Sequence, residues 1–108
     1  MRRLKGMDMG WVKDALKELR LGNSTKVRPK GGSMRGRIES GQLVTISPVE
    51  PHEVRVDDVV FVKWKGNYIL HLVKDIQGDN ILIGNNLGKE NGWATRDDVC
   101  GKVTEVSD

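Results

Sequence analysis

The spacing of apolar residues predicts one helix at the N-terminal end of the chain. Apolar residues recur there at helical spacing, opposite charged residues: Trp11, Val12, Ala15, Leu16 and Leu19. This stripe predicts an amphipathic helix from Asp8 to Leu21. Asp8 is a suitable N-cap, and Gly22 can end the helix. We interpret the stripe as a face packed on a sheet, and a partner-binding or membrane-surface helix is the alternative.

After Gly22 the apolar pattern changes to a period of two, which is typical of strands. The expected strands are rich in Val and Ile and are separated by Gly, Asn, Asp and Pro: Thr25 to Arg28, Gln42 to Ser47, Asp58 to Lys65, Tyr68 to Ile76, Asn80 to Ile83 and Val99 to Val106. Lys65-Gly66-Asn67 and Gln77-Gly78-Asp79-Asn80 predict tight hairpin turns. The pattern therefore predicts a mainly antiparallel β fold.

Two stretches fit neither period: Lys30 to Glu39, and Gly84 to Asp97. Long irregular segments are uncommon in a small domain unless they form a site or move. We therefore expect the first stretch to be the active segment of the protein.

The length of 108 residues suits a single domain. We divide the chain into a basic tail and helix, residues 1–25, and a β domain, residues 26–108. With 37% apolar and 31% charged residues, we expect a core that is small relative to the surface of the protein.

The charge pattern does not favour nucleic acid as a partner. The formal net charge is only +3, and acids are interleaved with bases, as in Lys13-Asp14 and Lys17-Glu18. No apolar run approaches the roughly 20 residues that cross a bilayer, and no apolar segment follows the basic N-terminus as in a signal peptide. These features predict a soluble protein.

The single cysteine, Cys100, cannot form an intramolecular disulfide. No CxxC motif or His/Cys cluster indicates a metal site. Both observations favour the cytoplasm and a protein without metal.

Ser33 is the candidate nucleophile. In Gly31-Gly32-Ser33-Met34 the hydroxyl follows two residues without side chains. Glycine lets the backbone approach a ligand closely, so neighbouring N–H groups can converge on an oxyanion. Ordinary loop chemistry is the alternative reading of Gly-Gly-Ser.

His71 is the candidate general base, which a serine needs for activation. It interrupts the apolar strand Tyr68 to Ile76, although a half-buried histidine bonded to a backbone carbonyl would explain this as well. His52, in a polar link, is interpreted as a surface residue. Lys74 lies three residues after His71, so regular alternation predicts that it faces away.

The pattern Gly-Gly-Ser-Met-x3-Ile-x2-Gly-x-Leu-Val-Thr-Ile, from Gly31 to Ile46, resembles the serine box of the LexA-like and type I signal-peptidase-like superfamily. This resemblance implies that Ser33 attacks the scissile carbonyl. It also implies that His71 stands where bacterial members carry a lysine, and where ER-type and archaeal signal peptidases use histidine.

Later segments extend the resemblance over about residues 26 to 106: Val56-Asp57-Asp58-Val59-Val60, Ile83-Gly84-Asn85-Asn86 and Asp97-Asp98-Val99-Cys100-Gly101-Lys102-Val103. Three positions depart from the family pattern. Gly36 replaces a frequent proline, Gln42 follows Gly41 in place of aspartate, and Asn85 replaces another aspartate.

The resemblance implies a LexA/signal-peptidase-like fold of twisted antiparallel sheets, partly barrel-like, with one N-terminal helix. It implies a serine endopeptidase that cleaves an extended peptide or protein segment in trans and needs no cofactor. Gly32 and Met34 would then contribute to the oxyanion site or bind substrate. Glu90 or Asp97 would supply the acid that orients His71.

Two other functions stay open. The first is an inactive peptide- or protein-binding module on the same fold, which the departures at Gly36, Gln42 and Asn85 favour. The second is a small nucleic-acid-binding β domain, in which Trp64 and Tyr68 would form a stacking surface.

Overall fold

A computed structural model describes residues 3–32 and 34–108 of the chain. Its elements, in chain order, are α1 (Arg3–Arg20), β1 (Thr25–Val27), β2 (Leu43–Ser47), η1 (Pro51–Glu53), β3 (Val59–Trp64), β4 (Asn67–Gln77), β5 (Asn80–Gly84), β6 (Glu90–Thr95), η2 (Arg96–Asp98) and β7 (Val99–Ser107). Here η denotes a short 3-10 helix. Within these ranges, no helix is both long and apolar enough to cross a membrane.

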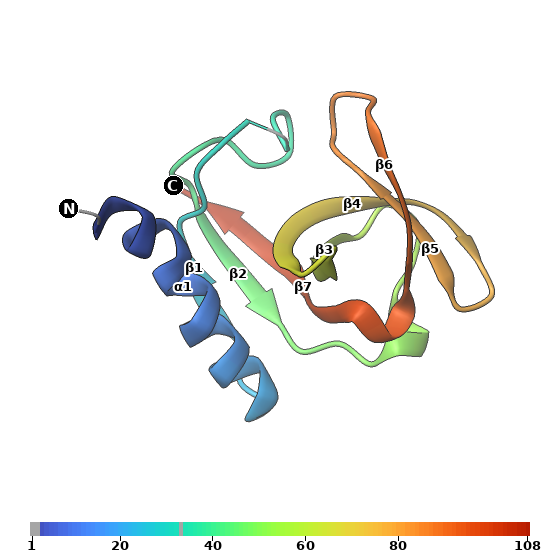
Figure 1. Ribbon diagram of the computed structural model, residues 1–108, viewed down its shortest axis with the longest axis horizontal. Coiled ribbons are helices and arrows are strands. Elements are labelled where there is room, and N and C mark those ends of the chain that lie inside the picture. The colour runs from blue at the N-terminus through green and yellow to red at the C-terminus, as the bar shows by residue number, and fades with distance from the viewer. Residues whose placement is uncertain (1–2, 33) are drawn as a thin grey trace.

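The strands of the described residues form one antiparallel sheet in the order β1-β2-β7-β3-β4-β5-β6. Strands β1 and β6 are its two edges. Figure 1 shows α1 beside β1 and β2, while the strongly curved β4 leads to the β5–β6 hairpin at the far end of the molecule. The predicted mainly β fold with one N-terminal helix is confirmed, and the described strands belong to one sheet rather than to several.

Both predicted hairpin turns are present. Trp64 pairs with Asn67, so Lys65 and Gly66 form a two-residue turn, and their φ angles of 49° and 83° are both positive. Positive φ at both central residues matches the twist of antiparallel strands. The β4–β5 turn is equally short, because Gln77 pairs with Asn80.

The helix ends as predicted but begins earlier. Gly22 has a φ of 86° and its N–H donates to the Leu19 carbonyl at 3.0 Å, which closes the helix after Arg20. The helix starts at Arg3, so the prediction that Asp8 caps it is wrong. The apolar stripe marked the part of the helix that packs on the sheet, whereas the helix continues N-terminally over residues of good intrinsic propensity, such as Leu4 and Lys5.

Part of the stretch from Gly84 to Asp97, predicted as irregular, is strand β6. It pairs with β5, with Ile81 opposite Ala94 and Leu82 opposite Trp93. The β6 segment is poor in β-branched residues, so the neighbouring strand determines its conformation. The other stretch, Lys30 to Glu39, contains neither helix nor strand in its described residues, as predicted.

The apolar core lies on both faces of the sheet. On one face, α1 contributes Val12, Ala15 and Leu19 to a cluster with the strands and the loop after β1. A second cluster lies on the opposite face and involves β3, β4, β5 and β6. Strand β3 is buried from Val59 to Val62, which explains its unbroken apolar run, because a central strand covered on both faces needs no alternation.

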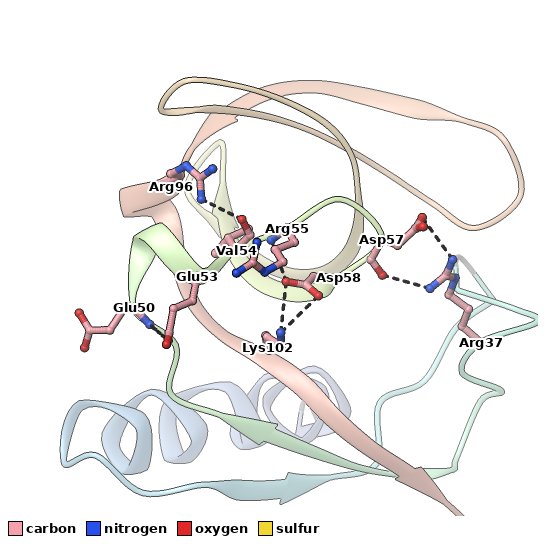
Figure 2. A network of polar contacts seen from close by, with 9 residues as sticks. All are labelled: Arg37, Glu50, Glu53, Val54, Arg55, Asp57, Asp58, Arg96 and Lys102. Atoms are coloured by element: carbon pink, nitrogen blue, oxygen red, sulfur yellow. Dashed lines mark hydrogen bonds and ion pairs between the residues drawn. The ribbon is translucent and has the colours of Figure 1, made fainter.

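Polar contacts hold the link between β2 and β3 (Figure 2). Asp58 accepts a hydrogen bond from the Arg55 N–H at 2.9 Å and forms an ion pair with Lys102 of β7 at 3.3 Å. The Arg96 guanidinium of η2 donates to the carbonyls of Pro51 and Val54 at 2.7 and 2.8 Å. The link is therefore attached to both η2 and β7.

Candidate functional site

The loop that carries Ser33 joins β1 to β2. The Gly41 N–H donates to the Pro29 carbonyl at 3.0 Å and closes the loop at its base. Met34 and Ile38 are 4% and 5% exposed and anchor the loop in the core on the α1 face. Ser33 itself lies outside the described residues. The structure places the residues on either side of it, such as Gly31 and Met34.

The same loop is held from outside by Asn86 and Asp57. Asn86, in the β5–β6 turn, donates to the Arg35 carbonyl at 2.8 Å and accepts from Arg37 Nε at 2.9 Å. Arg37 also forms an ion pair with Asp57 at 3.6 Å, as Figure 2 shows. Contacts from two distant parts of the chain therefore position the segment after Ser33.

Gly36 is a glycine for a structural reason. Its φ is 97°, and a Cβ at this position would lie 2.8 Å from Asn86 Nδ2. Proline holds φ near −65°, so it cannot adopt this conformation. The backbone conformation that brings Gly36 close to Asn86 is therefore one that the proline expected from the resemblance could not adopt.

His71 lies in β4, opposite Val60 of β3, and is half-buried. Its Nδ1 forms a hydrogen bond with the Leu70 carbonyl, which can only accept, so Nδ1 carries the proton and Nε2 has the free lone pair. Burial lowers the pKa of His71 from its ordinary value, the bond to Leu70 opposes this change, and the positive charge of Lys89 adds to the lowering.

Strand β4 has a partly unpaired edge at His71. Residues 67–71 pair with β3 on one side, whereas pairing with β5 on the other side begins only at Leu72. In the described part of the chain, no strand pairs with that second edge beside Tyr68, Ile69, Leu70 and His71. Backbone N–H and C=O groups on such an edge can accept an added strand.

A cavity of about 220 Å³ brings the candidate residues together. The Ser33 loop contributes Gly31 and Met34, β4 contributes His71, and α1 contributes Trp11. The described wall is completed by Pro29, Lys30, Ile38, Tyr68, Ile69 and Leu70. Gly31, Met34 and His71 thus border one space, although they are far apart in the chain.

The two candidate orienting acids lie elsewhere on the molecule. Asp97, in η2, lines a separate hollow together with His52. Glu90 is exposed at the start of β6, opposite Gly84. Among the described residues, the hydrogen-bond partner of the His71 ring is the Leu70 carbonyl rather than a carboxylate.

Lys74, the competing base, lies where the β4–β5 register shifts, between Val73 and Asp75. Regular alternation therefore does not apply at this position. A Cβ on Gly84 would lie 2.8 Å from the Lys74 side chain. Lys74 is not among the described residues that line the cavity, whereas His71 is.

The proposed stacking surface of Trp64 and Tyr68 is wrong. Tyr68 packs with Phe61 on the α1 face, with ring centroids 5.8 Å apart. Trp64 belongs to the cluster on the opposite face. The two rings lie on different faces because Trp64 pairs with Asn67, one residue before Tyr68, and side chains alternate along a strand.

Two residues at the site, Trp11 and Asn86, were not predicted from sequence, whereas the alternative interpretation of His71, a half-buried histidine bonded to a backbone carbonyl, matches the structure. The apolar stripe assigned Trp11 to the core and could not indicate a cavity wall. Asn86 belongs to a family-like segment, but nothing in the sequence pairs it with the loop of Ser33. The sequence did not indicate that this carbonyl belongs to Leu70.

Comparisons with protein-family models, with curated proteins and with solved structures find no match to this chain.

Proposed function

We propose that this chain is a serine peptidase of the LexA and signal-peptidase kind, with a fold of that type. In this proposal Ser33 is the nucleophile, His71 is the general base, and the protein cleaves an extended segment of another chain. One observation carries the proposal: Gly31 and Met34, on either side of Ser33, line the same cavity as His71.

The tautomer and the lowered pKa of His71 suit a general base. Because Nδ1 donates to the Leu70 carbonyl, Nε2 is free to accept the proton of a serine hydroxyl. The lowered pKa keeps the ring neutral at pH 7, so this lone pair is available. The carbonyl fixes the ring and its tautomer, which is the role given to an aspartate in Ser-His-Asp sites.

The reaction we propose has two steps. Ser33 Oγ attacks the scissile carbonyl while His71 takes its proton, and His71 then protonates the leaving amine as the acyl-enzyme forms. Water, deprotonated by His71, next releases the acyl group. Backbone N–H groups at Gly32 and Ser33 hold the oxyanion, and Met34 contributes to the wall of the substrate cavity.

The unpaired edge of β4 gives the substrate a place to lie. An extended segment can pair with residues 67–71 through main-chain hydrogen bonds, which position a peptide without demanding one sequence. The segment would pass beside His71 and the cavity. The single cysteine, half-buried Cys100, supports action in the reducing cytoplasm.

A serine-reactive phosphonate probe tests the proposal. We expect the wild-type protein to be labelled at Ser33, with labelling abolished in Ser33→Ala and His71→Ala. His52→Ala, which removes the exposed histidine of η1, and Ser107→Ala, near the end of β7, serve as matched controls and should be labelled like the wild type.

Labelling that persists in Ser33→Ala would contradict the proposal. So would a folded wild-type protein that no such probe modifies. The second result would favour a peptide-binding module, because the β4 edge and the cavity can bind a segment without any chemistry.

A further inference from the structure

Arg37, in the loop that carries Ser33, uses all three nitrogens of its guanidinium to contact two segments outside that loop. Nε donates to Asn86 Oδ1 at 2.9 Å, and Nη1 donates to the Asp57 carbonyl at 3.1 Å. Nη2 forms the ion pair with Asp57 Oδ1 at 3.6 Å, and Figure 2 shows both contacts with Asp57. A guanidinium presents its donors in a rigid, planar arrangement, so these contacts fix both its position and its direction.

Asp57 connects Arg37 to one side of the strand that carries His71. It lies just before β3, and its N–H donates to the Val73 carbonyl of β4 at 2.8 Å. The Val73 N–H in turn donates to the Asp58 carbonyl at 2.9 Å. Val73 is only two residues after His71 in β4. The position of Arg37 is therefore linked to the position of the His71 strand.

Asn86 connects Arg37 to the other side of the same strand. It follows β5, whose last residue, Gly84, pairs with Leu72 of β4. Leu72 comes directly after His71. Through Arg37, the loop is thus attached to segments that flank β4 on both sides, close to the imidazole.

Asp57 adopts a backbone conformation that usually takes glycine. Its φ is 77°, a region that is strained for most residues with a side chain. The side chains of Arg37 and Asp57 are 39% and 74% exposed, so their ion pair contributes little to stability. Strained residues of this kind concentrate at functional sites, which favours a role in the geometry of the site over a role in stability.

We propose that Arg37 is a positioning residue, which fixes the loop that carries Ser33 relative to His71. Asp57 and Asn86 are the partners that hold it in place. The inference rests on the proposed peptidase function and adds a residue that acts through the loop. Transfer of the serine proton requires hydrogen-bond reach of the base, so a small displacement of the loop slows the reaction.

The first test is Arg37→Lys, which keeps the charge but replaces the planar fork with a single ammonium. The limiting rate of phosphonate labelling at Ser33 is measured together with the probe concentration that gives half this rate. A displacement of about 1 Å can cost about 100-fold in rate, so we expect the limiting rate to fall about 10- to 100-fold. The half-saturating concentration and the urea midpoint should change little, because the ion pair is exposed.

Two further variants separate position from stability and from charge. Asp57→Gly removes the carboxylate that holds Arg37, so labelling should slow. Its urea midpoint should change little, because relief of the strained φ offsets the greater freedom of glycine in the unfolded chain. Arg35→Gln is the matched control in the same loop, and the Arg35 side chain makes no hydrogen bond or ion pair with the described residues. It should be labelled like the wild type.

If Arg37→Lys is labelled as fast as the wild type, the inference is overturned and the peptidase proposal remains intact. An equal fall in Arg35→Gln would also contradict the inference, because that variant leaves the contacts of Arg37 in place.

A thiol readout does not depend on peptidase activity. In Ser33→Cys, combined with Cys100→Ser so that one thiol remains, an imidazole within reach should lower the thiol pKa below its ordinary value of about 8.5. The pH dependence of alkylation measures this pKa, and adding Arg37→Lys should return it towards the ordinary value. If no phosphonate modifies the wild type but Arg37→Lys raises the thiol pKa, the peptidase proposal fails and the positioning role stands. An unchanged thiol pKa in Arg37→Lys would overturn the positioning role.

Discussion

At the scale of single residues, the protonation of His71 decides what the candidate site can do. Burial is the largest cause of its lowered pKa, and the charge of Lys89 acts in the same direction. The hydrogen bond to Leu70 acts in the opposite direction. The imidazole should therefore be neutral, and able to accept a proton, throughout the neutral pH range.

We predict that the rate of probe labelling at Ser33 falls as the pH drops through a midpoint below the ordinary histidine value of about 6.5. Well above this midpoint the rate should be flat, because the ring is already neutral. The same lowered pKa means that protonation of His71 destabilises the fold, so its contribution to stability is lost as pH falls through that midpoint.

The labelling rate between pH 4.5 and 8.5 measures this midpoint, and NMR titration of the His71 ring in His52→Ala gives it independently. Lys89→Met should raise the midpoint only slightly, since burial is the larger cause. A midpoint above 6.5, or a large change in Lys89→Met, would contradict this account.

At the scale of elements, Arg96 joins three segments that the sequence separates. From η2 its guanidinium donates to the Gly78 carbonyl in the β4–β5 turn and to the Pro51 and Val54 carbonyls around η1. A charged group that donates to three carbonyls, in two other segments, is among the stronger kinds of hydrogen-bonding group. Arg96 therefore connects the β4–β5 turn to the segment between β2 and β3.

We predict that Arg96→Ala lowers the free energy of unfolding by about 2 kcal/mol, the usual scale for hydrogen bonds to a charged group. Arg55→Ala is the matched control. The Arg55 side chain is exposed in the same link, and the backbone N–H of Arg55 makes the contact to Asp58. Urea unfolding measures the free energy of unfolding of both variants. Equal values for the two would show that the hydrogen bonds of Arg96 do not stabilise the fold.

At the scale of the whole molecule, β3 connects the two halves of the core. Phe61 points into the cluster shared with α1, whereas its neighbours Val60 and Val62 belong to the cluster on the opposite face. All three are 0% exposed. Phe61 also supports Trp11 at the cavity wall, so packing and site geometry depend on the same side chain.

We predict that Phe61→Ala lowers the free energy of unfolding by about 3–5 kcal/mol, because it leaves a large void at the centre of the sheet. Val56→Ala, at a side chain that is 48% exposed, should change stability little. Denaturant titration compares the two variants. A loss below about 1 kcal/mol for Phe61→Ala would mean that the core collapses around the void.

The sequence predicted the local features of the fold well. The helix end at Gly22 and the turn at Lys65-Gly66 depend on backbone conformations that a few neighbouring residues determine. The start of α1 and strand β6 were not predicted. Residues 90–95 become a strand because β5 lies beside them, which no local pattern indicates.

The candidate site also has features that depend on local sequence and features that depend on the tertiary structure. By themselves, the residues of the chain determined the glycine-rich loop around Ser33, the apolar strand interrupted by His71, and the antiparallel order of adjacent strands, because each depends on residues close in sequence. Only the tertiary structure decided that Gly31, Met34, His71 and Trp11 border one cavity. It also decided that a backbone carbonyl orients the imidazole, since that contact depends on how β4 bends and how its side chains pack.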